Sequence, residues 1–475
     1  MKIRYNIPQK LREKLCKAGE VMEGENKEYL KSALEQWCSV IEQNTQIEPG
    51  YYDNYKVKRG LRNSDGTGVL AGLTNVGQVH GYIMYEDEMI PDDGKLSYRG
   101  VDVTDIVTAC EKENRFGYEE VCYLLLFGKL PTQKELDDFK ALVGAMRPLP
   151  FGFREDMIMK TPSNDIMNKL ARSVLSMYSY DNNPDSTDLY NIIRQSILLL
   201  SRVPTMVAYA YQAKAHYFDG KSLYIHNPQP ELSMAENFLY MIRPDNQYTD
   251  LEAKVLDLAM ILHAEHGGGN NSAFTTRVVS STGSDTYSAI AAAIGSLKGP
   301  KHGGANRKVI AMIEDFKANV DDMNDRGAVA NHIAKLLDKD GFDHSGLIYG
   351  MGHAIYTKSD PRTVQLKKKA EELADVTGNM KEFKLYSLIE ELTPEIFAEK
   401  KGKKHMCANV DLYSGFVYKC LNIPPELYTP MFAISRMAGW CAHRIEEVMY
   451  GGRIIRPAYK SVSGAGDYVP IKDRA

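Results

Sequence analysis

Residues 299–306 read Gly299-Pro300-Lys301-His302-Gly303-Gly304-Ala305-Asn306, and this octapeptide is the most informative stretch of the chain. Gly299 and Pro300 end an alanine-rich helical run at 288–298. His302 follows beside two glycines, which have no Cβ, so a ligand can approach the imidazole closely. The plain alternative is a helix C-cap whose histidine complements the helix dipole. In either case the octapeptide predicts a corner that follows a helix and presents a histidine, a group able to exchange protons near neutral pH.

The sequence around this corner is helical in pattern from Tyr118 onward. Thr249-Asp250-Leu251-Glu252 has the spacing of a capping box and opens an amphipathic run. Further helices are expected at 306–319, 326–339, 362–377, 393–400 and 428–449. Between residues 61 and 99 glycines are frequent, which favours turns and small strands such as 82–85. Strands do not alternate with helices, which argues against a Rossmann or barrel architecture. We therefore predict a mostly α fold with short β segments near the N-terminal part.

The composition argues against several classes of protein. The chain has 475 residues, with 58 Lys and Arg against 62 Asp and Glu and a formal net charge of −4. This balance leaves no basic footprint for nucleic acid or an anionic membrane surface. No apolar run approaches the roughly 18 residues of a membrane-spanning helix. Residues 1–29 lack the apolar stretch of a signal peptide and are too acidic for a transit peptide. Seven cysteines without a Cys-x-x-Cys pair favour reduced thiols, so we expect a cytoplasmic protein.

A second histidine cluster ends the helical run that opens at Thr249. It reads His263-Ala264-Glu265-His266-Gly267-Gly268-Gly269-Asn270, and its three glycines free the backbone to wrap a ligand. A glycine C-cap with surface histidines is the plain alternative. A zinc site would lack a nearby third ligand. An esterase oxyanion loop would need a Gly-x-Ser-x-Gly elbow, which the chain does not contain.

Two further clusters add arginine and carboxylate groups. Gly350-Met351-Gly352-His353 precedes Asp360-Pro361-Arg362, which places a forked guanidinium at a helix start. Asn409-Val410-Asp411-Leu412-Tyr413-Ser414-Gly415 places Asp411 among apolar residues. The alternatives are a salt-bridged loop arginine and an aspartate that caps a helix. Arg436 lies in an apolar helical run and Arg456 precedes Pro457; a buried arginine is usually paired or bound to an anion.

Taken together, the clusters combine histidines on glycine turns, one carboxylate and several arginines. This set supplies a general base, hydrogen-bond donors for an oxyanion, and a cage for a multiply negative small molecule. The sequence therefore indicates an enzyme that acts on a small anionic substrate.

In content, order and approximate separation these clusters resemble the motifs of the citrate synthase family, from about residue 58 to the C-terminus. Leu96-Ser97-Tyr98-Arg99-Gly100 matches a further family motif. The resemblance implies a large helical domain, 58–304 with 423–475, and a small helical lid domain, 305–422. Residues 1–57 are expected to form a helical N-terminal extension.

The same resemblance implies an acyltransferase that condenses acetyl-CoA with oxaloacetate and water to give citrate and CoA. Asp411 would remove a methyl proton from acetyl-CoA, His302 would hydrogen-bond the enol oxygen, and His353 would polarise the ketone of oxaloacetate. The residues implied to hold substrate are His266, Arg362, Arg436, Arg99, Asn270 and, reaching the neighbouring site of a homodimer, Arg456. The residues implied to contact CoA are Leu347, Ile348, Tyr349, Gly350 and Met351. No metal and no tightly bound cofactor are implied.

Two positions depart from the family pattern. Bacterial relatives usually carry an aromatic residue where Met351 stands and a basic residue where Thr357 stands, and here Lys358 lies one position further on. The contacts to the CoA phosphates are therefore left open. The acyl group is also left open, because 2-methylcitrate synthases share the catalytic groups but use propionyl-CoA. Propionyl-CoA has one methylene more than acetyl-CoA, and a binding pocket discriminates such a difference by only about 1–3 kcal/mol. A non-catalytic binding protein with the family fold is a third alternative.

Overall fold

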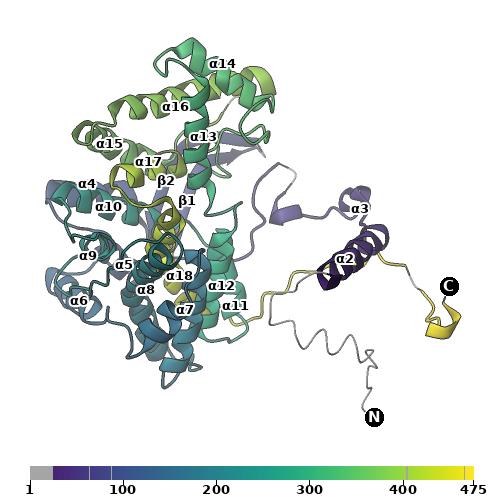
Figure 1. Ribbon diagram of the computed structural model, residues 1–475, viewed down its shortest axis with the longest axis horizontal. Helices are drawn as coiled ribbons and strands as arrows, with labels where there is room; N and C mark the ends of the chain where they lie inside the picture. The colour runs from purple at the N-terminus through teal and green to yellow at the C-terminus, as the bar shows by residue number, and fades with distance from the viewer. Residues whose placement is uncertain (1–24, 64, 87, 403–404, 465, 475) are drawn as a thin grey trace. The chain divides into compact units, whose positions relative to one another are not determined.

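The structure is a computed structural model that describes residues 25–63, 65–86, 88–402, 405–464 and 466–474. Its backbone contacts divide the chain into a main unit, Ala71–Arg456, and a second unit formed by the chain up to Leu70 together with Pro457 onward. Helices dominate, and the described strands form a single small sheet, β1-β2-β3 (Figure 1). The prediction of a mostly α fold with short β segments is confirmed.

The main unit contains most of the elements. Its helices are α4 (Val103–Lys112), α5 (Tyr118–Phe127), α6 (Gln133–Ala145), α7 (Ile166–Ser176), α8 (Leu189–Tyr217), α9 (Met234–Ile242), α10 (Asp250–His263), α11 (Asn271–Ser280), α12 (Thr286–Lys298), α13 (Ala305–Asn319), α14 (Arg326–Leu337), α15 (Pro361–Val376), α16 (Met380–Lys401), α17 (Val410–Cys420) and α18 (Tyr428–Tyr450). In Figure 1, α13 to α17 gather at one end of this unit, and α5 to α9, α11 and α12 lie toward the other. The boundaries of a large and a small domain within the unit stay a prediction.

Helix α18 forms the centre of the core. It packs on α5, α8, α10, α11 and α12, and it is buried from Tyr428 to Glu446. A helix that is covered on every side has apolar residues all around it, and this explains why most residues between 428 and 446 are apolar. Its few polar residues, among them Arg436 and His443, are therefore held inside the protein.

A β-hairpin provides the sheet and is longer than the sequence predicted. Strand β1 (Gly77–Tyr85) pairs antiparallel with β2 (Glu88–Tyr98), which pairs with the short β3 (Val101–Asp102). Glycine and proline in β2 weaken the strand signal there, and the sequence predicted only small strands, such as 82–85, between residues 61 and 99. The hairpin contacts the loop 353–361: Thr357 Oγ1 donates to the Gly81 carbonyl at 2.7 Å, and the Gly94 N–H donates to Ser359 Oγ at 3.1 Å.

We expect Gly94→Ala to disturb this contact. A Cβ at residue 94 would overlap the Ser359 carbonyl oxygen and lie 2.8 Å from Tyr356 Cδ1. Overpacking of this kind costs about 1–3 kcal/mol of unfolding free energy. Thermal unfolding should show the loss, and hydrogen exchange should become faster for the amides of loop 353–361. Gly295→Ala is the matched control: position 295 in α12 has open space, so there the substitution should leave stability equal or higher. Unchanged exchange in the loop would contradict a bracing role for the hairpin.

Helix α16 begins earlier than predicted. It runs from Met380 to Lys401, whereas the sequence predicted a helix only at 393–400. The structure keeps Pro394 inside the helix. Phe383, Tyr386 and Ile389 are buried on one face, and this packing offsets the loss of one backbone hydrogen bond at the proline.

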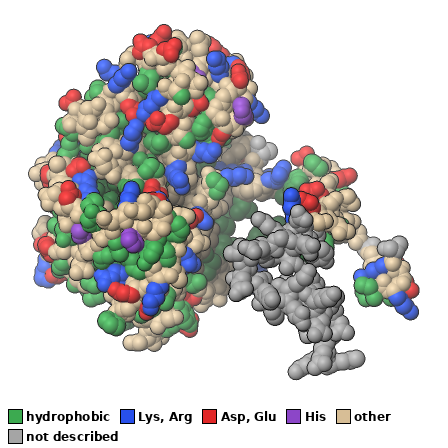
Figure 2. Space-filling view, in the orientation of Figure 1, with side chains coloured by type: hydrophobic (Ala, Val, Ile, Leu, Met, Phe, Trp, Pro, Cys, Tyr) green, Lys and Arg blue, Asp and Glu red, His purple; other side chains and the backbone are tan. Residues whose placement is uncertain are grey.

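The second unit holds α2 (Glu25–Asn44) and α3 (Pro49–Asn54). These helices fall within the extension expected at 1–57, of which residues 1–24 lie outside the described residues. Trp37 and Ile41 on α2 are each 58% exposed. In the part of the chain that the structure describes, no helix is long and apolar enough to cross a membrane. On the face drawn in Figure 2, Lys and Arg side chains are interspersed with Asp and Glu.

Candidate active site

The turn between α10 and α11 holds His266 at the centre of a buried cluster. His266 is 8% exposed, and its Nε2 is buried without a hydrogen-bond partner among the described residues. Its ring stands edge-on to the ring of His353, with centroids 5.2 Å apart. Burial, together with Arg362 and His353, lowers the pKa of His266 well below its usual range. The ring is therefore neutral at pH 7 and has one nitrogen available to a ligand.

The loop after Gly352 orients His353. The backbone N–H groups of Ile355 and Tyr356 both donate to His353 Nδ1, each at 3.1 Å. An imidazole nitrogen that accepts hydrogen bonds carries no proton, so the neutral ring carries its proton at Nε2. The ring of Tyr356 stacks on His353 with centroids 4.6 Å apart and stands against His266 at 5.6 Å. His353 is thus set up to donate a hydrogen bond from Nε2.

Arg362 lies in the first turn of α15 and is both salt-bridged and buried. Its Nε and Nη2 donate to the two carboxylate oxygens of Asp360 at 3.0 and 2.7 Å. Asp360 is also the N-cap of the helix, because the same carboxylate accepts from the Arg362 backbone N–H at 3.0 Å. Arg362 is salt-bridged, as one alternative expected, but it lies in a buried helix start and not in a loop, and the bridge holds the guanidinium beside His266 and Tyr356.

Asp411 is fixed to the same loop through the segment that precedes α17. Gly352 N–H donates to the Cys407 carbonyl, and Asn409 N–H donates to the Gly350 carbonyl, both at 2.8 Å. Gly350 has a φ of 84°, and a Cβ there would lie 2.9 Å from Leu412 Cα, so this close approach requires glycine. The helix cap is Asn409, whose side chain accepts from the Asp411 backbone N–H. The Asp411 carboxylate is therefore not used for capping.

The pKa of Asp411 suits a base that works near neutral pH. Loss of hydration raises the pKa of Asp411 to about 6; Asp360 adds to this effect, while Arg362 and Arg436 oppose it. Above pH 6 the group is a carboxylate of higher basicity than an exposed aspartate.

His302 sits on the predicted corner between α12 and α13. Its Nε2 lies 3.2 Å from the hydroxyl of Ser272 on α11, and its ring faces Phe432 at 6.5 Å between centroids. Burial and the charge of Arg436 lower the pKa of His302 to about 4. His302 is therefore neutral at pH 7 and able to donate one hydrogen bond.

Arg436 on α18 is completely buried. Its Nε donates to the His263 carbonyl at 2.6 Å, and its guanidinium lies over the ring of Phe432 at 4.7 Å. Both Nη1 and Nη2 are buried without an acceptor among the described residues. Buried donors are normally satisfied, so these two nitrogens point to an anionic ligand.

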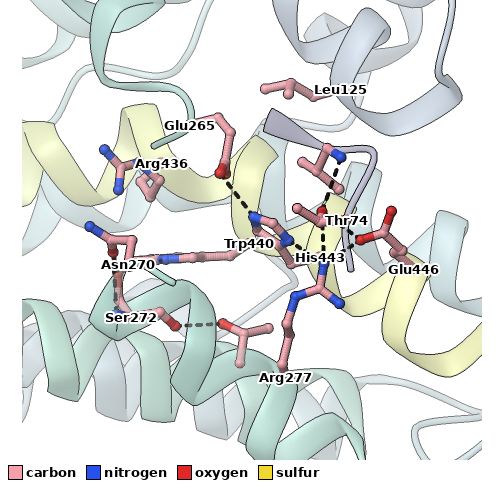
Figure 3. Close-up of polar contacts among 12 residues, drawn as sticks. Thr74, Leu125, Glu265, Asn270, Ser272, Arg277, Arg436, Trp440, His443 and Glu446 are labelled. Atoms are coloured by element: carbon pink, nitrogen blue, oxygen red, sulfur yellow. Dashed lines mark hydrogen bonds and ion pairs between the residues drawn. The ribbon is translucent and has the colours of Figure 1, made fainter. Parts of the chain in front are cut away.

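Buried ionisable side chains next to Arg436 form a hydrogen-bonded chain (Figure 3). Arg277 donates to His443 Nδ1 at 2.7 Å and to the Glu446 carboxylate. Because a guanidinium only donates, His443 carries its proton at Nε2, from which it donates to Glu265 Oε1 at 2.9 Å. Burial opposes ionisation of Glu265, but His443 and Arg436 lower the pKa of its carboxyl below the usual range. Glu265 therefore places a permanent negative charge beside Arg436.

Glycine on two separate elements makes room for Glu265. A Cβ at Gly77 of β1 would lie 2.7 Å from Glu265 Cγ, and a Cβ at Gly439 of α18 would overlap Glu265 Oε2. Sequence reasoning did not assign a role to Glu265. It also missed Tyr356 and Phe432, which look like ordinary core residues in the sequence.

The remaining predicted residues lie in different settings. Asn270 caps α11 and accepts from the Ser272 backbone and hydroxyl, at 3.3 and 2.9 Å. Arg99 has φ 50° and donates to the Leu125 carbonyl from Nε and Nη2. Arg456 is exposed at the end of the main unit. The contacts that the structure shows for Arg99 and Arg456 do not involve His266, His302, His353 or Asp411.

The loop proposed for CoA is anchored at several points. Leu347 is 57% exposed, while Ile348 and Gly350 are buried. Tyr349 donates to Asp343, which also pairs with Lys308 of α13 at 3.0 Å, and Met351 pairs with Ala408 as an isolated bridge. Within the described residues, no three His, Cys, Asp or Glu side chains gather as a metal site would require.

Comparison with known proteins identifies the family. The family model described as citrate synthase, C-terminal domain, matches residues 66–458. The chain belongs to the citrate synthase family. A citrate synthase from Synechocystis sp. is 33% identical over 426 residues, which cover 89% of this chain and 95% of that protein. A 2-methylcitrate synthase from Corynebacterium glutamicum is 32% identical over 426 residues, covering 88% of this chain and 99% of that protein.

Solved structures of citrate synthases share the fold. The citrate synthase of Thermoplasma acidophilum, solved as a ternary complex with carboxymethyl coenzyme A and oxaloacetate, superposes with a TM-score of 0.72 at 27% identity. The match covers 88% of this chain and 99% of that one. The predicted citrate synthase-like fold is confirmed, and the chain is an acyltransferase of the citrate synthase type.

Proposed function

We propose that the protein condenses acetyl-CoA with oxaloacetate and water to give citrate and CoA. One observation carries the proposal: Nη1 and Nη2 of Arg436 and Nε2 of His266 are buried and have no hydrogen-bond partner in the described part of the chain. They lie in a cluster that also holds His302, His353 and Asp411. A dicarboxylate would satisfy these donors, and Arg362 adds a second positive charge.

The first step is enolisation. The carboxylate of Asp411 takes a proton from the methyl carbon of acetyl-CoA, and the C–H electron pair moves toward the thioester oxygen. His302 donates a hydrogen bond to that oxygen as it gains charge. A thioester α-proton is weakly acidic, so base and donor must act together; such groups contribute about 10²–10⁴ and 10²–10³ in rate.

The second step forms the carbon–carbon bond. The Nε2–H of His353 donates to the ketone oxygen of oxaloacetate, and the enol carbon attacks the ketone carbon. As the bond forms, the ketone oxygen takes the Nε2 proton of His353 and becomes the hydroxyl of a citryl thioester. Water then adds to the thioester carbonyl, the C–S bond breaks, and CoA leaves as the thiol.

The site draws on two parts of the chain, as a closing lid requires. We propose that His353, Arg362 and Asp411 move with a small domain, 305–422, toward His266 and Arg436 in a large domain, 58–304 with 423–475. Closure would exclude water from the enol. Residues 347–351 would meet CoA, Arg99 and Asn270 would contribute on the substrate side, and Arg456 would reach the neighbouring site in a homodimer. We expect the enzyme to be cytoplasmic.

The acyl group is decided by a kinetic comparison. With oxaloacetate fixed, free-thiol release should give a higher kcat/KM for acetyl-CoA than for propionyl-CoA. A preference for propionyl-CoA would make the enzyme a 2-methylcitrate synthase, which the Corynebacterium relative keeps open. No thiol release with either substrate would defeat the enzymatic proposal and favour a non-catalytic binding protein.

A further inference from the structure

The hydroxyl of Ser272 has three polar neighbours (Figure 3 shows two of them). Trp440 Nε1 lies 3.0 Å away, Asn270 Oδ1 2.9 Å and His302 Nε2 3.2 Å. Ser272 and Trp440 are both completely buried. Water therefore does not substitute for a missing partner, and the hydrogen bonds of this hydroxyl can be counted.

Two of these neighbours have a fixed role as donor or acceptor. An indole N–H only donates, so Trp440 donates to Ser272 Oγ. Asn270 Oδ1 only accepts, and the Ser272 backbone N–H donates to the same oxygen at 3.3 Å, which fixes the orientation of the amide. A hydroxyl has one hydrogen and two lone pairs. With one lone pair taken by Trp440, its hydrogen can point only to Asn270 or to His302.

These two orientations dictate opposite tautomers of His302. When the hydroxyl donates to Asn270, as in the structure, His302 donates from Nε2 to the second lone pair of Oγ. When the hydroxyl donates to Nε2, that nitrogen is bare and the neutral ring carries its hydrogen at Nδ1. The proton position on His302 thus follows the rotation of one buried hydroxyl.

We propose that Trp440 is a positioning residue that acts through Ser272: its N–H occupies one lone pair of the hydroxyl and so keeps the hydroxyl hydrogen on Asn270 Oδ1 or on His302 Nε2. In the second case His302 has the Nδ1–H tautomer, which stabilises the enol. The inference rests on the proposed function. Nε2 is occupied by Ser272, so Nδ1 is the nitrogen that can face the acyl group, and it donates only if it carries the hydrogen. Without the indole N–H, the hydroxyl gains a third orientation in which it bonds to neither partner.

The test compares kinetic constants of Trp440→Phe with those of the unmodified enzyme. We expect kcat to fall about tenfold, the effect of one lost hydrogen bond in a buried site. KM for oxaloacetate should stay within about twofold, because Arg436, Arg362 and His266 keep their places. Trp37→Phe is the matched control, since Trp37 is the other tryptophan of the two in the chain and is 58% exposed; it should leave both constants unchanged.

A double-mutant cycle separates positioning from packing. If Trp440 acts through Ser272, Trp440→Phe should reduce kcat no further in an enzyme that already carries Ser272→Ala. A merely structural tryptophan would give losses that multiply. If Trp440→Phe fails to fold, a benzothienyl analogue of tryptophan at position 440, in the Trp37→Phe background, removes only the N–H and repeats the measurement.

The inference is overturned by wild-type kcat in the variant that lacks the N–H, or by multiplying losses in the cycle. These outcomes differ from failure of the proposed function, in which the unmodified enzyme would release no CoA from acetyl-CoA or propionyl-CoA in the presence of oxaloacetate.

Discussion

Asp411→Asn should lower kcat by about 10²–10⁴-fold while oxaloacetate still binds. The substitution keeps the shape of the side chain and removes its ability to take the methyl proton, which is worth this much in general-base catalysis. The helix start is preserved, because Asn409 caps the Asp411 backbone N–H and the carboxylate takes no part. Turnover from thiol release and oxaloacetate affinity from calorimetry measure the two effects separately.

The pH profile gives a second measure of the same group. Because dehydration raises the pKa of Asp411 to about 6, the base is lost as pH falls, and kcat/KM for acetyl-CoA should fall about tenfold per pH unit below pH 6. Asp105→Asn is the control: Asp105 also lies in the first turn of a helix, α4, but is exposed, so turnover should be unchanged. Near-normal turnover in Asp411→Asn would remove this residue as the base.

Arg436→Met should abolish most oxaloacetate binding and leave the fold intact. Removing one partner of a buried charge pair costs about 2–5 kcal/mol, or roughly 30-fold to several thousand-fold in affinity. Stability should fall as well, because the substitution removes the positive charge that lowers the pKa of the buried Glu265 carboxyl and the Nε donor of the His263 carbonyl.

Arg444→Met, on the same helix, is the matched control for substrate binding. Arg444 is equally buried, but its guanidinium donates to Thr286 Oγ1, Ser280 Oγ and the Ser284 carbonyl at 2.8–3.1 Å. Its loss should lower the melting temperature and leave the oxaloacetate affinity of the folded protein unchanged. Calorimetry and thermal unfolding on both variants test the contrast. Equal effects of the two substitutions on affinity would show that Arg436 does not bind the substrate.

The groups that could be predicted from sequence lie on glycine-lined turns or at a helix start, where local sequence determines the structure. His302 and His353 each stand beside glycines, and the structure places both on such corners. Asp411 stood out because a carboxylate rarely occurs in so apolar a context. Local chemistry therefore indicated most of the candidate site without any knowledge of the packing.

The residues that could not be predicted depend on contacts between distant segments. Phe432, Tyr356 and Trp440 have the appearance of core residues. Only tertiary packing places Phe432 against His302, Tyr356 against His353, and Trp440 within hydrogen-bond distance of Ser272. The hairpin was underestimated for a similar reason, since its glycines at 81 and 94 serve a close approach to loop 353–361 and depress the local strand signal.

The backbone bonds between residues 350–352 and 407–409 have a consequence for engineering. They tie the loop that carries His353 to the helix that carries Asp411. The proposed base and the proposed carbonyl polariser therefore belong to one structural unit, residues 350–411, called the cassette below. A chimera that exchanges residues 350–411 with those of a relative would transplant both groups with their spacing intact. A recombination junction between the two segments would instead combine the loop 350–352 of one protein with the segment 407–409 of another. Chimeras within this family should therefore keep activity more often when the junctions lie outside the cassette than when they lie inside it.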